Sequence, residues 1–130
     1  MKPLKLVMSA FGSYAGVETL DFARIGANGL YLITGETGSG KTTIFDALSF
    51  ALFGEASGRV RDKYLTLRSD FADEKTKTYV ELDFLSGQHQ YHIRRAIKKT
   101  GKDSELRLPD GTIISGERRV SDKIVEIIGL

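Results

Sequence analysis

The chain has 130 residues, of which 28% are charged and 41% hydrophobic, and its formal net charge is +2. This composition is typical of one soluble globular domain, and so small a net charge gives no argument by itself for a nucleic-acid partner. Without cysteine the chain has no disulfide or thiolate metal site, and without a bilayer-length apolar run or signal peptide we expect a cytoplasmic protein with no membrane partner.

The N-terminal segment predicts an antiparallel hairpin. Residues 2–10 read as a strand, because apolar residues alternate with others from Leu4 to Met8. A turn-rich loop follows at 11–16, and residues 17–22 alternate again as a second strand. The two strands are close enough along the chain to pair directly.

The next segment carries the most informative motif. Residues 30–34 form a nearly continuous apolar run, typical of a strand buried on both faces. Residues 35–42 read GETGSGKT and match the phosphate-binding loop G-x-x-x-x-G-K-[ST]. Residues 42–53 are apolar around most of a helical circumference, and Gly54 stands where a left-handed residue would end that helix. Strand, glycine-rich turn and helix are the context that the motif requires.

The residue types of the motif suit phosphate chemistry. The glycines let the backbone wrap closely around an anion, and the amides at the start of the helix favour negative charge. Lys41 would reach the β- and γ-phosphates, and the Thr42 hydroxyl would ligate Mg²⁺. The alternative is a strand-to-helix turn that binds nothing, but such a turn does not require Lys-Thr at the start of its helix. The motif therefore predicts a nucleoside triphosphate site.

The rest of the chain predicts a meander and a closing helix. Residues 54–78 are polar and read as a surface excursion with one short helix around 60–67. Alternating segments at 78–84, 90–98 and 104–108 are separated by turns and predict three strands with one solvated face. From Ser115 onward, apolar residues recur at helical spacing, and Gly129 is expected to end that helix; the apolar positions are Val120, Ile124, Ile127 and Ile128.

The chain lacks the carboxylates that nucleotide hydrolysis needs. Phosphate-loop enzymes hold Mg²⁺ with an Asp after an apolar strand and usually activate water with a Glu. Asp83 lies in an alternating strand and Asp46 lies within the phosphate-loop helix, so neither has that setting. His89 and His92 are three apart on one strand and face opposite sides, which disfavours a metal pair. We expect nucleotide binding without independent hydrolysis.

The order of these parts resembles the N-terminal portion of the SbcC family of DNA-repair ATPases, which are SMC-like members of the ABC superfamily. The matching segments are MKPLKLVMSAFGSY, NGLYLITGETGSGKTTIFDALSFALFGE, LRSDFADEKTKTYVELDF and the closing IIGL. The most specific part is GETGSGKTTIFDALSFALFG. The resemblance implies an α/β fold (α+β, with a mixed sheet) in which 1–130 is one domain: the N-terminal phosphate-loop lobe of an ABC-type ATPase head.

The resemblance also implies what completes the site. In this family a long coiled coil separates the N-terminal lobe from a C-terminal lobe, which carries the signature motif, the magnesium-binding Asp and the catalytic Glu. The implied cofactors are ATP and Mg²⁺. The implied partners are DNA, a nuclease subunit resembling SbcD, the C-terminal lobe of the same protein, and a second head that dimerises through ATP. A nucleoid-associated place in the cytoplasm follows from these partners.

Site residues carry over by position. Ser13, in the loop after the first strand, matches a family position that reaches the nucleotide; family members in archaea and eukaryotes often have Arg just before it, where this chain has Gly12. Leu65, Thr66 and Leu67 align with a segment near the adenine or ribose. The expected phosphate and magnesium contacts come from the motif and its first helical turn: Gly35, Glu36, Thr37, Gly38, Ser39, Gly40, Lys41, Thr42 and Thr43, with Thr42 on the metal.

A basic stretch, HIRRAIKKTGK, is the expected DNA surface. Its cations are Arg94, Arg95, Lys98, Lys99 and Lys102, which could lie along phosphates without reading sequence. The alternative is a solvated hairpin edge, where lysines block strand pairing.

Three functions stay open at this point. The first is the nucleotide-binding lobe of an SbcC-like ATPase. The second is a free-standing small NTPase or kinase in which Asp83 or Asp46 serves the metal. The third is a DNA-binding or scaffold module with a vestigial nucleotide site.

Overall fold

The fold is described by a computed structural model that covers residues 1–24, 38–54, 67–70, 72–99 and 101–129. The described residues form a six-stranded sheet in the order β2-β1-β3-β4-β5-β6, with every neighbouring pair antiparallel. The strands are β1 (Lys2–Ser9), β2 (Val17–Asp21), β3 (Thr78–Ser86), β4 (His89–Lys98), β5 (Gly101–Arg107) and β6 (Ile113–Ser115). The two long helices are α2 (Gly38–Phe53) and α3 (Glu117–Ile128).

The predicted hairpin and meander are both present. β1 pairs with β2 in the register Leu6↔Leu20, and β3 continues into β4 through a tight turn that closes on the pair Ser86↔His89. Gly87 in that turn has φ 64°, a left-handed conformation that glycine adopts without steric cost. The period-two alternation in the sequence therefore predicted these strands correctly, and their boundaries differ from the expected ones by one to three residues.

Some elements of the structure differ from those expected, and two expected elements fall outside the described residues, wholly or in large part. The strand expected at 30–34 and most of the helix expected around 60–67 lie outside the described residues. β6 was not predicted, because its three residues directly follow the Pro109–Gly111 turn and are too few to show a period. The closing helix begins at Glu117, two residues later than expected, and ends at Gly129 with φ 84°, as predicted.

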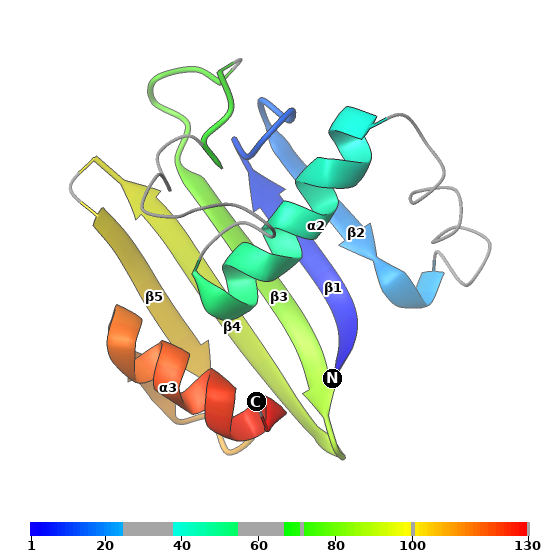
Figure 1. The fold of residues 1–130 in the computed structure, drawn as a ribbon, viewed down its shortest axis with the longest axis vertical. Coiled ribbons are helices and arrows are strands. Elements are labelled where there is room, and N and C mark those ends of the chain that lie inside the picture. Colours follow the sequence, from blue (N-terminus) through cyan, green and yellow to red (C-terminus); the bar gives the residue numbers. More distant parts are fainter. Residues whose placement is uncertain (25–37, 55–66, 71, 100, 130) are drawn as a thin grey trace.

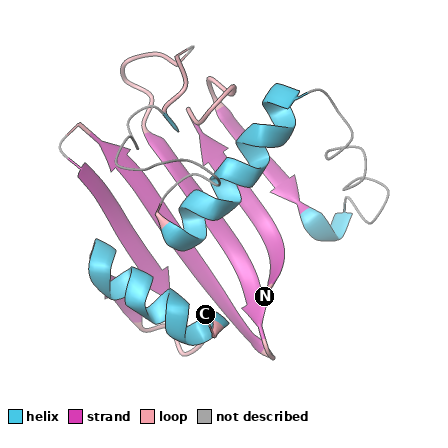
Figure 2. Cartoon of the chain, viewed as in Figure 1, coloured by secondary structure: helices cyan, strands magenta, loops and turns pink. Residues whose placement is uncertain are grey.

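Both helices lie on the same face of the sheet, as Figures 1 and 2 show. Every second residue of the central strands points to this face, and the side chains there are fully buried. They include Leu6, Met8, Val80, Leu82, Phe84, Ile93 and Leu106, which pack with Phe50 of α2 and with Val120 and Ile124 of α3. The other face of the sheet carries charged and polar side chains, which explains the clean alternation of β3.

Helix α2 is apolar on more than the side that packs on the sheet. Ala47, Phe50 and Ala51 are completely buried, whereas Phe45 and Phe53 each remain 41% exposed. A helix that is apolar around most of its circumference is normally covered on both sides. Within the described part of the chain, neither helix reaches the length and apolarity needed to cross a lipid bilayer.

Candidate nucleotide site

The phosphate-loop motif leads into the start of α2. The helix begins at Gly38, so Gly38–Thr42 form its first turn, whereas Gly35, Glu36 and Thr37 lie outside the described residues. The first turn contains no acidic residue. The free amides and the positive end of the helix dipole therefore meet no competing carboxylate from that turn, which is the chemistry that a phosphate group requires.

The loop after β1 packs directly on this helix start. Ser13 donates its backbone N–H to Thr43 Oγ1 at 3.3 Å, and the two hydroxyl oxygens are 3.1 Å apart. A Cβ built on Gly12 would lie 2.5 Å from Thr43 Cγ2 and 2.6 Å from Thr43 Oγ1. Gly12 also has φ 58°. The glycine is thus required by both space and backbone, and an arginine at this position would not fit this geometry.

A third segment fixes the same loop. Gly12 donates its backbone N–H to the carbonyl of Leu67 at 2.7 Å, and Ser69 donates to the carbonyl of Ala10 at 2.8 Å. Ala10 is fully buried with φ 48°, a backbone conformation that residues other than glycine rarely adopt and that is often found at functional sites. Leu67 itself is 7% exposed and packs in the core, while Leu65 and Thr66 lie outside the described residues. Segments 10–13, 43 and 67–69 therefore meet beside the start of α2.

The side chain of Arg95 holds the C-terminal end of α2. Arg95 was expected on the DNA surface, but its side chain is 0% exposed, so that expectation is wrong. Its Nε donates to the carbonyl of Ala51 at 2.7 Å and its Nη2 to the carbonyl of Leu52 at 2.8 Å. The sequence carried a signal for this: Arg95 is two residues from both Ile93 and Ile97 on the strand, so it shares the helix-covered face with them.

Glu117, the first residue of α3, supplies the counter-charge. Its carboxylate lies 3.1 Å from Arg95 Nη1 and 3.3 Å from Lys102 Nζ, and it accepts a hydrogen bond from the Ser104 hydroxyl. Burial alone would raise the pKa of Glu117, but the hydrogen bond from Ser104 and the two cations together hold this pKa below its ordinary value. Burial lowers the pKa of Arg95, and Glu117 opposes that shift.

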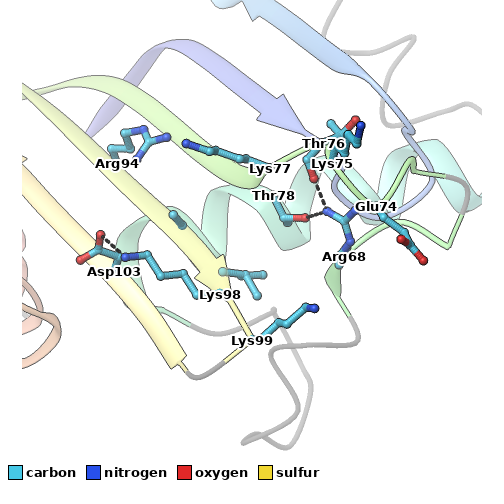
Figure 3. A pocket seen from close by; sticks show the side chains of 12 residues that line it. Arg68, Glu74, Lys75, Thr76, Lys77, Thr78, Arg94, Lys98, Lys99 and Asp103 are labelled. Atoms are coloured by element: carbon cyan, nitrogen blue, oxygen red, sulfur yellow. Dashed lines mark hydrogen bonds and ion pairs between the residues drawn. The ribbon is translucent and has the colours of Figure 1, made fainter.

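Lys102 of the basic stretch thus lies with Arg95, whereas Arg94, Lys98 and Lys99 border a groove at the other side of the sheet. Its volume is about 480 Å³, and it lies where β3 begins and β4 ends. Figure 3 shows Lys77, Arg94 and Lys98 extending over these strands. Its basic lining residues are Arg68, Lys75, Lys77, Arg94, Lys98 and Lys99, against the acidic Glu74 and Asp103.

These cations differ in how they are engaged. Arg68 is structural, because it donates to the carbonyl of Thr76 and the hydroxyl of Thr78, both at 2.5 Å. Arg94 lies 4.5 Å over the Tyr79 ring and 3.5 Å from Glu81, and Lys98 pairs with Asp103 at 3.2 Å. In the described ranges no ion pair engages the exposed side chains of Lys75, Lys77 and Lys99, which leaves them available to an anion.

Among the described residues, the acidic and histidine side chains do not assemble a metal centre. Asp83 points away from α2, on the face opposite to Leu82, and lies 2.5 Å from His92 Nδ1. Asp46 is 7% exposed within α2. Across the described ranges, no group of three or more His, Asp or Glu side chains could hold a metal ion.

Comparison with known proteins agrees with this arrangement. A family model described as an AAA domain matches residues 5–129. The chain belongs to this family. The match takes in both long helices, five strands and most of β1, and it includes the loop at Gly12 and the helix start at Thr43.

Curated relatives give a more specific comparison than the family model does. The chain is 46% identical over 109 residues to the SbcC subunit of the nuclease SbcCD from Staphylococcus saprophyticus, a match that covers 82% of this chain and 11% of the relative. It is 34% identical over its whole length to the protein of the same name from Vibrio cholerae and 37% identical to that from Staphylococcus aureus, covering 14% of each. The resemblance to SbcC read from the sequence is therefore confirmed. The chain spans only 11–14% of the length of these relatives.

A solved structure supports the fold. The SMC head domain from Thermotoga maritima matches 95% of this chain and 42% of its own, with a TM-score of 0.54 and 21% sequence identity. The expected α/β fold of an N-terminal phosphate-loop lobe is confirmed at this level, and its described sheet has six antiparallel strands, of which β3–β6 form the expected meander.

Proposed function

We propose that this chain is the nucleotide-binding lobe of an SbcC-like ATPase and that it binds ATP with Mg²⁺ at the start of α2. The observation that carries the proposal is the phosphate-loop sequence leading into α2, whose first turn lacks acidic residues and is braced by the Gly12–Ser13 loop. The names of the relatives support the same assignment.

Each part of the motif has a role in this proposal. The amides of residues 35–40 would surround the phosphates, and Lys41 would neutralise their charge. The Thr42 hydroxyl would hold Mg²⁺, which would offset charge on the β- and γ-phosphates. Thr43 and Ser13 brace the start of α2, and the 65–67 segment would lie on the adenine or ribose side.

We also propose that a second lobe completes the site. Asp83 faces away from α2, so its position argues against the free-standing NTPase or kinase in which it would serve the metal. The exposed Phe45 and Phe53 give α2 an apolar surface suited to a C-terminal lobe of the same protein. That lobe would bring the missing carboxylates. The whole protein would then dimerise through its heads around ATP, act with a nuclease subunit resembling SbcD, and process DNA ends or hairpins in double-strand-break repair.

Calorimetry on the purified chain tests the nucleotide site. ATP with Mg²⁺ should bind saturably to the wild-type chain, and Lys41→Ala should abolish this binding because it removes the phosphate-neutralising charge. Lys5→Ala, an exposed lysine on the opposite face of the sheet, is the matched control and should bind as the wild type does. Equal binding by Lys41→Ala and the wild type would refute the proposed site.

The groove supports a finer proposal about DNA. Arg94, Lys98 and Lys99 remain the DNA contacts, now joined by Lys75 and Lys77, since the groove gathers cations of the 75–77 segment and of β4. Replacing Lys77 and Lys99 by Gln should weaken duplex binding uniformly across sequences and lower the slope of log affinity against log salt by about 2. Unchanged affinity, with Lys2→Gln/Lys5→Gln as the charge-matched control, would leave the groove as a solvated sheet edge.

A further inference from the structure

The C-terminal end of α2 is capped from the sheet rather than from its own last turn. The final carbonyls of a helix have no partner within it, and α2 has no basic residue in its last turn to meet them. The carbonyl of Phe50 accepts from the Gly54 N–H at 2.8 Å. The next two carbonyls accept from the Arg95 guanidinium, and Lys102 Nζ donates to the carbonyl of Gly54 at 3.0 Å. Two cations thus occupy the negative end of the helix dipole.

Those cations are joined to α3 by one carboxylate. Glu117 contacts both Arg95 and Lys102, and it stands so close to α2 that a Cβ on Gly54 would lie 2.5 Å from its Oε1. The Ser104 hydroxyl accepts from Arg95 Nη1 at 3.1 Å and donates to Glu117, so it relays between the two charges. Arg95 Nη2 also lies 3.4 Å from the hydroxyl of Ser121, one turn further along α3. A single buried guanidinium therefore binds the end of α2 and the start of α3.

The two ends of α2 are mechanically connected. Sixteen helical residues are about 24 Å long and move as a unit, because their backbone bonds are satisfied along the axis. The nucleotide proposed above would act at one end, where Gly12 leaves no room between the loop and Thr43. At the other end, Arg95 is fully buried with its hydrogen bonds directed at α2 and α3. A displacement or stiffening of α2 would therefore be felt by the contacts at both of its ends.

We propose that Arg95 and Glu117 form a coupling clamp, through which nucleotide binding at the start of α2 is transmitted to α3. Arg95 acts here as a positioning residue that holds α2, and Glu117 carries the position of α2 into the first turn of α3. Because such coupling is reciprocal, weakening the clamp must also weaken nucleotide binding. This inference rests on the proposed nucleotide site, and it adds a residue set about one helix length away from it.

Amide hydrogen exchange on the 130-residue chain, with and without Mg²⁺ and a non-hydrolysable ATP analogue, tests the clamp. In the wild type, the analogue should slow exchange in the first turn of α3, where the Val120 N–H donates to the Gly116 carbonyl. Glu117→Gln keeps the side-chain shape but removes the charge. It should abolish that slowing and weaken analogue binding at least about fivefold, the lower range of measured couplings.

Matched variants separate coupling from simple loss of structure. Glu126→Gln removes a carboxylate from the same helix, where the side chain is 70% exposed and pairs with Lys123, and it should behave as the wild type does. Arg95→Lys keeps the charge, but one ammonium cannot reproduce the planar fork that reaches both carbonyls and Glu117, so coupling should be lost. Ser104→Ala removes the relay with no change of charge and should reduce the coupling in the same direction, which keeps the test open if Arg95→Lys fails to fold.

Two results are distinguishable. If the wild type binds the analogue but Glu117→Gln shows the same affinity and the same slowing in α3, the clamp proposal is overturned and the nucleotide site stands. If the wild type binds no analogue in calorimetry, the proposed function is overturned, and the transmitted signal with it.

Discussion

Replacing Gly12 by Ala tests the geometry on which the nucleotide site rests. Gly12 has φ 58°, and an L-residue held in this left-handed region loses roughly 1–2 kcal/mol. The added Cβ would lie 2.5 Å from Thr43 Cγ2, far inside van der Waals contact, and Thr43 is only 5% exposed. Forcing a methyl group into such a packed position costs about 1–3 kcal/mol more. We therefore expect Gly12→Ala to lower the free energy of unfolding by about 2–5 kcal/mol.

Urea unfolding of the purified chain measures this difference. The matched control is Gly16→Ala in the same loop, where the new Cβ would meet nothing within 4 Å and where the free energy of unfolding should stay nearly unchanged. Adding Thr43→Ala should restore part of the stability to Gly12→Ala, because it removes the two nearest atoms and leaves only a Cβ contact of 3.0 Å. Equal stability of the Gly12→Ala and Gly16→Ala variants would refute the close approach of the loop to α2.

Two further predictions concern the core and the clamp. Phe50→Ala should lower the free energy of unfolding by about 3–5 kcal/mol, because Phe50 is fully buried and its ring centroid lies 5.8 Å from that of Phe11. The control Phe45→Ala changes a side chain that is 41% exposed and should cost much less stability. Equal losses of unfolding free energy in the two variants would contradict the packing of α2. The pKa of Glu117 is lower in the fold than its ordinary value of about 4.3, so its contribution to stability is complete above that pH and is lost as the pH falls toward the folded pKa. The difference in unfolding free energy between the wild type and Glu117→Gln should therefore shrink on acidification below about pH 4, and a pH-independent difference would contradict the ion pairing.

Local patterns predicted the elements of this fold well. The alternation of β3 and β4 and the helical spacing of α3 follow from burial of one face, which leaves a period that is visible in sequence. The three residues of β6 were missed because a strand so short has no period. The phosphate loop was recognisable because its chemistry demands particular residues at fixed spacing.

Contacts between distant segments were not predictable in this way. Arg95 was assigned to the DNA surface together with the other cations of the basic stretch. Its place on the strand face of Ile93 and Ile97 was visible in the sequence, but its partners, the carbonyls of α2 more than forty residues earlier in the chain, were not. The need for glycine at Gly12 arises from Thr43, thirty-one residues later, which no local pattern displays. In both cases the missing information is the packing of α2 on its surroundings.

The proposed function has this chain bind nucleotide without hydrolysing it by itself. The most direct measurement is phosphate release by the purified chain at Mg²⁺–ATP concentrations that calorimetry shows to be saturating. We predict saturable binding with no steady turnover, because across the described ranges no group of three or more His, Asp or Glu side chains could hold a metal ion. Steady hydrolysis that Lys41→Ala abolishes would contradict the account.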